Sequence, residues 1–271
     1  MNIDIFFKKQ IEIIDCALDK YLPKPKTYPM VIHQAMRYAV FSGGKRIRPI
    51  LAIEACRVCR GKISDVLIFA CAIELIHAFS LVHDDLPSLD NDTTRRGRPT
   101  LHKKFGEAIA ILAGDALLNF ACGLVSKGKN YKKQNLINHE LSQAIGTSGM
   151  VGGQVVDVFP SGKKTLGEIN YINHHKTALL IAVCLKIGAI TASAPKQQTK
   201  GLYDFGKDLG CIFQITDDLL DNDGLVRIIG QEKAKQQAQN VSDCAKQRLN
   251  IFGKRAERLR EITDYVTNRK K

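Results

Sequence analysis

Apolar residues recur every three to four positions along most of this 271-residue chain, which is the spacing of one face of an α-helix. The pair Gly43-Gly44 and prolines such as Pro23 and Pro49 stand where that pattern breaks, at positions typical of helix ends and first turns. No stretch alternates between apolar and polar residues around hairpin turns, and the polar run 90–99 is expected to be a loop. The predicted helices are 5–22, 30–41, 49–59, 65–85, 105–126, 133–147, 166–194 and 200–220, with one or two polar helices within 230–268.

The composition agrees with a single all-α domain over residues 1–271. Hydrophobic residues make up 45% and charged residues 25%, ordinary globular proportions that exclude a disordered chain. The most apolar runs, 66–82 and 178–192, are interrupted by residues such as Glu74 and Lys186, so no stable membrane insertion is expected. The N-terminus also lacks the pattern of a secretory signal.

The cysteines indicate the redox compartment. There are eight, scattered along the chain, and only Cys56 and Cys59 form a C-x-x-C spacing, with no second pair to complete a zinc site. This usage favours reduced thiols and a cytoplasmic protein.

The net charge is strongly positive, at +13, because 40 Lys and Arg face 27 Asp and Glu. Such a charge raises the hypothesis of nucleic-acid binding. The chain has no Trp and only 7% aromatic residues, so it offers few rings for stacking on bases, and its basic residues are dispersed. An anionic small substrate, or simply a basic surface, explains the charge as well, and no nucleic-acid partner is expected.

Two aspartate clusters each end a long apolar helix. The C-terminal end of a helix is the negative end of its dipole, and neighbouring carboxylates repel one another. A divalent cation relieves both effects, and carboxylate ligands indicate Mg²⁺. One cluster alone would be read as a solvated helix end, but two favour a metal site. The clusters are Asp84, Asp85 and Asp90, and Asp217, Asp218 and Asp221.

Basic residues near the first cluster are candidates for binding the phosphates that Mg²⁺ often bridges. The segment GGKRIRP at 43–49 combines a flexible backbone, three cations and the start of a helix. Arg95 and Arg96 follow the first cluster within one loop, and His77 precedes Asp84 by two helical turns and shares its face. Each feature alone is typical of an ordinary surface or core, but together they favour a site for two diphosphates.

These motifs resemble the trans-isoprenyl diphosphate synthases over about residues 28–221. The matching segments are GGKRIRP at 43–49, ELIHAFSLVHDDLPSLDNDTTRRGRPT at 74–100, GDAL at 114–117, GGQ at 152–154, HHKTALL at 174–180 and FQITDDLLD at 213–221. Within the family, the first acidic motif is similar to that of the bacterial farnesyl diphosphate synthases, also called geranyltranstransferases. The resemblance implies a bundle of long helices around a central cavity, with the two acidic clusters facing each other across its mouth, and a homodimer.

The resemblance also implies a reaction, the head-to-tail joining of isopentenyl diphosphate to an allylic diphosphate. The six aspartates of the two clusters would hold three Mg²⁺ on the allylic diphosphate. The implied contacts with isopentenyl diphosphate are Lys45, Arg48, His77 and Arg96. The implied contacts with the allylic diphosphate, where the bond breaks, are the catalytic residues Arg95, Lys176, Thr177 and Gln214. No side-chain base is expected, because the released diphosphate is the family's usual candidate base.

Phe79 bears on product length. It lies five residues before Asp84, about 7–8 Å along a helix that rises 1.5 Å per residue, where a bulky ring would close the pocket that takes the growing tail. In the family, an aromatic residue here accompanies fifteen-carbon products. The expected product is farnesyl diphosphate, made from dimethylallyl diphosphate through geranyl diphosphate. The alternative is a geranylgeranyl diphosphate synthase.

After Asp221 the chain departs from the family pattern. A loop with two lysines that contact diphosphate is expected between Asp221 and Gly230 but has no counterpart. A true deletion would impair catalysis, whereas a mobile loop near 221–225 that is missing from this sequence would not. The second interpretation is favoured, because every upstream site residue is present.

Two other functions compete with the condensing enzyme and nucleic-acid binding. A class I terpene cyclase shares the helical fold, but the GGKRIRP segment and the DDLLD motif argue against it. A non-catalytic synthase subunit is supported only by the short connection after Asp221.

Overall fold

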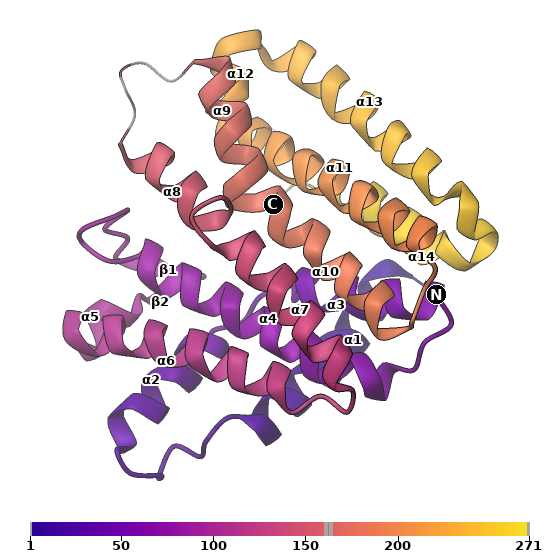
Figure 1. Cartoon of the computed structure of the whole chain (residues 1–271). Coiled ribbons are helices and arrows are strands. Elements are labelled where there is room, and N and C mark those ends of the chain that lie inside the picture. Colours follow the sequence, from indigo (N-terminus) through magenta and orange to yellow (C-terminus); the bar gives the residue numbers. More distant parts are fainter. Residues whose placement is uncertain (1, 160–161, 163–164, 270–271) are drawn as a thin grey trace. The chain divides into compact units, whose positions relative to one another are not determined.

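The computed structural model describes residues 2–159, 162 and 165–269, and most of these are helical (Figure 1), which confirms the all-α class. The chain divides into two compact units. The first consists of Met1–Ile50 and Leu67–Gln134, and the second of Leu51–Val66 and Asn135–Lys271. The single domain expected from the sequence stays a prediction.

The first unit contains most of the N-terminal helices and a small hairpin. Its elements are α1 (Ile3–Tyr21), α2 (Met30–Val40), most of α4 (Ile63–Asp84), β1 (Thr94–Arg95), β2 (Arg98–Pro99), α5 (Leu101–Phe105) and α6 (Glu107–Ser126). Helix α1 begins earlier than predicted because the Asn2 side chain accepts a hydrogen bond from the Asp4 amide at 2.8 Å. The predicted helix 105–126 is two helices, because Gly106, with a φ of 84°, separates α5 from α6.

The second unit contains most of α3 and α7 and every later helix. Its elements are α3 (Ile47–Val58), α7 (Tyr131–Ile145), α8 (Met150–Val158), α9 (Leu166–Ile172), η1 (Asn173–Ala178), α10 (Leu179–Thr191), α11 (Lys196–Asp221), α12 (Leu225–Ile229), α13 (Gln231–Arg248), η2 (Leu249–Ala256) and α14 (Glu257–Thr267). The predicted helix 166–194 consists of α9, α10 and the π-helical turn η1 between them. Such turns occur frequently at functional sites.

The polar run 90–99, predicted to be a loop, contains a hairpin. Strands β1 and β2 pair antiparallel, with Arg95 opposite Arg98. The turn residues Arg96 and Gly97 have φ values of 54° and 72°, the left-handed conformation that two-residue hairpin turns require. Strands of two residues are too short for an alternating pattern, which is why the sequence analysis missed them. The hairpin holds Arg95 and Arg96 in a defined conformation after the first acidic cluster.

Helices α10 and α11 form the core of the second unit. Helix α10 is buried over almost its whole length, from Leu180 to Thr191, as expected for a helix that is apolar on all sides. Gly206 of α11 lies so close to α10 that a Cβ would stand 2.5 Å from the Ala182 Cα. Close packing of these two helices places the C-terminal half of α11 beside η1, where Lys176 and Thr177 lie.

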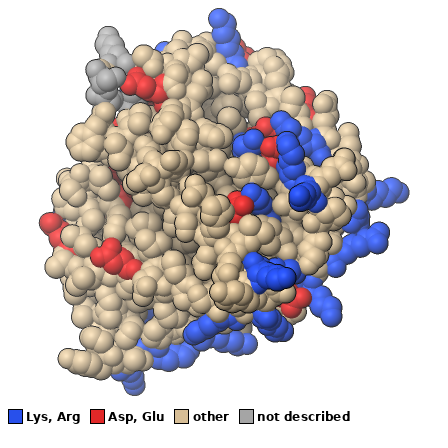
Figure 2. All heavy atoms as spheres, in the orientation of Figure 1, with Lys and Arg blue, Asp and Glu red and all other residues tan. Residues whose placement is uncertain are grey.

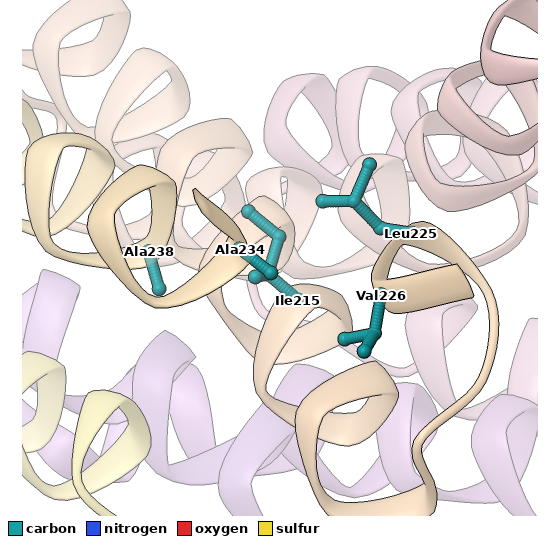
Figure 3. Packing of buried hydrophobic residues seen from close by; sticks show 5 residues of the cluster. All are labelled: Ile215, Leu225, Val226, Ala234 and Ala238. Carbon is teal, nitrogen blue, oxygen red and sulfur yellow. The ribbon is translucent and has the colours of Figure 1, made fainter. Parts of the chain in front are cut away.

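A small apolar cluster fastens the end of α11. Figure 3 shows that its members come from α11, α12 and α13 and lie close together. They are Ile215, Leu225, Val226, Ala234 and Ala238. Because α12 follows α11 after a short connection, this packing fixes the course of the chain directly after the second acidic cluster.

Two helices are long and apolar enough to span a membrane, although the interrupted apolar runs in the sequence led us to expect no membrane insertion. By length and composition, α4 and α6 both reach that threshold, with 61% and 39% of their most apolar windows buried in the protein. The core helix of a globular protein passes the same test, so two such helices are weak evidence for a membrane. Figure 2 shows Lys and Arg in several groups on one face, with acidic residues among them.

Candidate active site

The first acidic cluster lies where α4 ends. The Asp90 amide donates to the Asp84 carbonyl at 2.9 Å, and the Asn91 amide donates to the Leu86 carbonyl at 3.1 Å. The loop therefore folds back onto the helix end and brings the Asp90 backbone next to that of Asp84. Asp84 is partly exposed and Asp90 is exposed, so solvent reaches both of these aspartates.

Asp85 differs from its neighbours, because it is buried and bound to Arg95. The Arg95 Nε lies 2.7 Å from the Asp85 Oδ1, and a second nitrogen lies 2.6 Å from the same atom. Burial raises the pKa of Asp85, and the hydrogen bond from Arg95 opposes that rise. Arg95 also pairs with Asp92 at 3.2 Å. The ion pair of Asp85 with Arg95 fastens the hairpin to the end of α4, and each of these two side chains offsets the charge of the other.

His77 lies on α4, the helix that ends at Asp84, and arginine side chains from other segments lie near it. The Arg48 Nη1 lies 3.4 Å from the His77 Nε2. Burial, followed by the charges of Arg48 and Arg96, holds the pKa of His77 well below its usual value, so the imidazole is neutral near pH 7. Lys45 is exposed and Arg48 is half-buried. All of these residues belong to the first unit, on segments that the sequence predicted to bind phosphate.

Arg96 rests on the glycine pair before Lys45. Its guanidinium donates to the Gly43 carbonyl, and a Cβ on Gly44 would stand 2.5 Å from the Arg96 Nη1. Gly43 and Gly44 have φ values of 93° and 129°, which side chains other than glycine rarely adopt. The two glycines are therefore required both for the backbone turn and for the close approach of Arg96.

In the second acidic cluster, Asp218 is the buried member. It accepts hydrogen bonds from the Leu225 amide at 2.8 Å and from the Gln214 Nε2 at 3.3 Å. Burial raises the pKa of Asp218, and the Leu225 amide opposes that rise. Gly224, with a φ of 53°, leaves no room for a Cβ, which would stand 2.6 Å from this carboxylate. Asp218 thus joins α11 to α12.

The other two aspartates of α11 are more exposed. Asp221 is exposed, and the Asp217 side chain is 39% exposed. Asp217 forms an ion pair with Arg269, which also donates to the Phe213 carbonyl at 2.9 Å and lies 3.9 Å from the centre of the Phe213 ring. Arg269 was not among the predicted site residues, since 52 residues separate it from Asp217 along the chain.

Lys176 and Thr177 lie on η1 in the second unit. The Lys176 Nζ is 2.7 Å from the Asp157 Oδ2, and the Thr177 hydroxyl donates to the Gln214 Oε1 at 3.2 Å. Because Gln214 in turn donates to Asp218, a hydrogen-bonded chain links η1 to the second acidic cluster. Asp157 was missed, although it follows the GGQ segment that the sequence analysis singled out.

Phe79 is half-buried on α4 and packs edge-on against His83, with 5.0 Å between ring centres and 77° between ring planes. His83 lies 3.2 Å from the Ile111 carbonyl of α6. Gly114 of α6 faces the His83 ring with no space for a Cβ. The glycine of the GDAL segment therefore leaves room for the His83 ring, which packs against Phe79.

The donor set fits Mg²⁺ by its chemistry, because the exposed members of both clusters are carboxylates. Among the residues that the structure describes, no group of three or more His, Cys, Asp and Glu is close enough together to hold a metal ion. The first cluster belongs to the first unit and the second cluster to the second unit. The expectation that they face each other across one cavity therefore stays a prediction.

Known proteins resemble this chain over nearly its whole length. A family model described as polyprenyl synthetase matches residues 29–267. The farnesyl diphosphate synthase of Geobacillus stearothermophilus is 41% identical over 246 residues, covering 89% of this chain and 82% of that protein. The chloroplastic geranylgeranyl pyrophosphate synthase of Capsicum annuum is 37% identical over 293 residues, covering 99% and 79%.

A solved structure agrees with these sequence matches. The crystal structure of an FPP/GFPP synthase from Zymomonas mobilis, in its apo form, has a TM-score of 0.94 and 36% identity to this chain. The similarity covers 98% of this chain and 99% of that one.

Proposed function

Because the chain belongs to the polyprenyl synthetase family, we propose that it condenses isopentenyl diphosphate with dimethylallyl and geranyl diphosphate, with farnesyl diphosphate as its main product. One observation carries the proposal. Helix α4 bears His77, which lies near Arg48 of α3 and Arg96 of the hairpin turn, and two turns later it bears Asp84, with Asp90 folded back beside it. Helix α4 thus contributes His77 to the proposed diphosphate site and Asp84 to the proposed metal site.

His77 and the cations of the 43–48 and 95–96 segments are assigned to isopentenyl diphosphate. Lys45, Arg48 and Arg96 supply positive charge, and the neutral His77 adds a ring nitrogen that accepts or donates a hydrogen bond without further charge. Arginine suits this role because its planar fork matches phosphate oxygens. The support is their gathering around the Gly43-Gly44 turn.

The allylic diphosphate is assigned to the two acidic clusters and their neighbours. The more exposed carboxylates, Asp84, Asp90, Asp217 and Asp221, would hold Mg²⁺, with three ions expected from the family resemblance. When bound, Mg²⁺ would offset the negative charge of the diphosphate. Asp85 and Asp218 also belong to the expected ligand set, and their buried contacts favour the role of fixing each cluster in place.

Lys176, Thr177, Gln214 and Arg95 would contact the allylic diphosphate itself. As the allylic carbon–oxygen bond breaks, its electron pair leaves with the diphosphate, and positive side chains stabilise that charge. The double bond of isopentenyl diphosphate then attacks the carbocation, and the product loses a proton to the released diphosphate. The apolar residues of α4 would keep water away from the cation.

Product length is assigned through Phe79. Its ring is half-buried and supported by His83, which suits the floor of a pocket. A geranylgeranyl diphosphate synthase is the second candidate, because the similar proteins include both farnesyl and geranylgeranyl synthases.

The short connection after Asp221 stays part of the proposal. The match to the Capsicum protein extends over 293 residues against 271 in this chain, so the relative carries residues without a counterpart here. We place such a missing segment near 221–225, where α11 and α12 are joined by Asn222, Asp223 and Gly224. The cytoplasmic location, the absence of a nucleic-acid partner and the homodimer are retained as expectations, and a monomeric mass by sedimentation at micromolar concentration would refute the dimer.

The test is incubation with labelled isopentenyl diphosphate, Mg²⁺ and one allylic primer at a time, followed by chromatography of the dephosphorylated products. Fifteen-carbon farnesol is expected from dimethylallyl and geranyl diphosphate. Twenty-carbon alcohol as the main product would instead assign a geranylgeranyl synthase. No incorporation with any primer would overturn the condensing function and favour a non-catalytic subunit.

A further inference from the structure

Arg46 occupies the middle of the GGKRIRP segment but does not face solvent as Lys45 does. Its side chain is only 2% exposed, whereas Lys45 is exposed. The Arg46 backbone is also left-handed, with a φ of 49°, a conformation that is costly for a residue with a long side chain. The surroundings of Arg46 must therefore hold it in place.

Three segments of the first unit bind the Arg46 guanidinium. Its Nε lies 2.9 Å from the Asp15 Oδ1 on α1, and its Nη1 lies 2.7 Å from the Glu74 Oε1 on α4. Its Nη2 donates to the Val40 carbonyl at the end of α2 at 2.6 Å. Only a guanidinium presents donors in three directions from one planar group, so a lysine could not replace all three contacts.

Glu74 is the other half of this arrangement. Its side chain is 3% exposed, and Oε2 has no hydrogen-bond partner in the described part of the chain. Burial raises the pKa of Glu74, while the charges of Arg46, Arg48 and Arg96 oppose that rise. Glu74 lies three residues before His77 on α4, which is close to one helical turn. Its negative charge therefore lies within the electrostatic reach of the cation group.

We propose that Arg46 and Glu74 are positioning residues: their buried ion pair holds the left-handed turn at 43–46 against α4, so that Lys45, Arg48 and Arg96 converge on one diphosphate. The identity of that ligand rests on the proposed function. Glu74 also offsets part of the repulsion that would otherwise drive these cations apart when the site is empty.

The test separates positioning from simple stabilisation by measuring binding of isopentenyl diphosphate to the metal-free protein by calorimetry. Steady-state KM values for isopentenyl and geranyl diphosphate accompany the titration. In Arg46→Lys and Glu74→Gln, the Kd and KM for isopentenyl diphosphate should rise about tenfold or more, because small displacements of binding groups cost that much. The KM for geranyl diphosphate should change less than twofold.

A matched control exists in the same chain. Glu54 is also buried, is paired with Arg57, and likewise has its pKa raised by burial. Glu54→Gln should lower the melting temperature yet leave the Kd for isopentenyl diphosphate unchanged. A rise in Kd equal to that of Glu74→Gln would overturn the proposal, because any buried charge would then have the same effect.

An apolar replacement of the whole pair keeps the proposal falsifiable if the single variants fold poorly. Replacing a buried ion pair with apolar residues often restores stability, so Arg46→Met with Glu74→Leu should recover much of the melting temperature. Its Kd for isopentenyl diphosphate should stay raised. Recovery of both quantities would show that the pair is only structural. Failure of the wild-type protein to bind isopentenyl diphosphate would count against the proposed function instead.

Discussion

Arg269 and Asp217 form an ion pair that joins the chain directly after α14 to the second acidic cluster. The Arg269 side chain is 8% exposed, and it also contacts the carbonyl and the ring of Phe213. A side-chain cation therefore occupies a carboxylate that the proposed function assigns to Mg²⁺, and metal binding at Asp217 must compete with it.

Replacing Arg269 should strengthen metal binding. In Arg269→Gln the competing charge is gone, so the apparent Kd for Mg²⁺, measured by calorimetry without substrate, should fall roughly threefold to tenfold, in line with about 1 kcal/mol for a partly exposed ion pair. The control is Arg248→Gln, because Arg248 pairs with Asp208 on the same helix α11. A Kd that is unchanged in Arg269→Gln would show that Asp217 does not bind the metal or that Arg269 is not a competitor.

Removing the exposed carboxylates should abolish turnover without unfolding the protein. Asp84→Ala and Asp217→Ala each remove a proposed metal ligand and relieve repulsion among the remaining aspartates. In Asp84→Ala the melting temperature without Mg²⁺ should therefore stay level or rise slightly. Asp217→Ala also loses the ion pair with Arg269, so its melting temperature should fall modestly, in line with about 1 kcal/mol for a partly exposed pair. Condensation of labelled isopentenyl diphosphate measures turnover, and calorimetry measures stability. A large loss of melting temperature in either metal-free variant would assign the carboxylate a structural role.

The buried aspartate of the second cluster should contribute to stability. Asp218→Ala leaves the Leu225 amide without its acceptor, and an unsatisfied buried donor costs about 1–3 kcal/mol. The variant should therefore have a lower free energy of unfolding in urea, measured without Mg²⁺. Stability equal to that of the wild type would refute a structural role for the buried Asp218.

Phe79→Ala should lengthen the product. Without the ring, the pocket floor opens and chains longer than fifteen carbons should appear among the chromatographed alcohols. Because Phe79 is only half-buried, the loss of stability should be smaller than the ~3–5 kcal/mol typical of a fully packed phenylalanine. Phe69→Ala is the control, since Phe69 lies on the same helix and is 3% exposed. It should cost more stability and leave the product length unchanged. An unchanged fifteen-carbon product from Phe79→Ala would show that Phe79 is not the floor.

His77 should make the protein less stable on acidification. The unfolded chain takes up a proton at His77 near pH 6.5, whereas burial and nearby arginines hold the pKa of the folded state well below that value. The unfolded state then binds more protons, so the free energy of unfolding should decrease from about pH 7 towards pH 5.

Urea denaturation at several pH values in this window checks the sign. In His77→Gln the slope should be shallower than in the wild type, while raised carboxyl pKa values, such as that of Asp218, act in the opposite direction in both proteins. His139→Gln, on an exposed position of α7, is the control and should keep the wild-type slope. Equal slopes in the wild type and His77→Gln would contradict a lowered pKa for His77 in the folded protein.

The sequence by itself determined the helices and the motifs, because both depend on residues close together along the chain. The three-to-four-residue periodicity predicted most helices, and the spacing of the aspartates predicted an acidic cluster at the end of α4, where the Asp90 amide donates to the Asp84 carbonyl. Local rules also explain the errors. A single left-handed Gly106 divides a predicted helix, and strands of two residues leave no pattern to read.

Only the tertiary structure decided which of several chemically equal side chains is exposed. Adjacent aspartates or cations look alike in sequence, yet Asp85 is buried against Arg95, Asp218 against Leu225, and Arg46 against Glu74. Each choice depends on a partner brought in by folding, from seven residues away in the case of Leu225 to 28 in that of Glu74. Burial of a charge is costly without such a partner, so packing between distant segments decides which carboxylates and cations face a ligand.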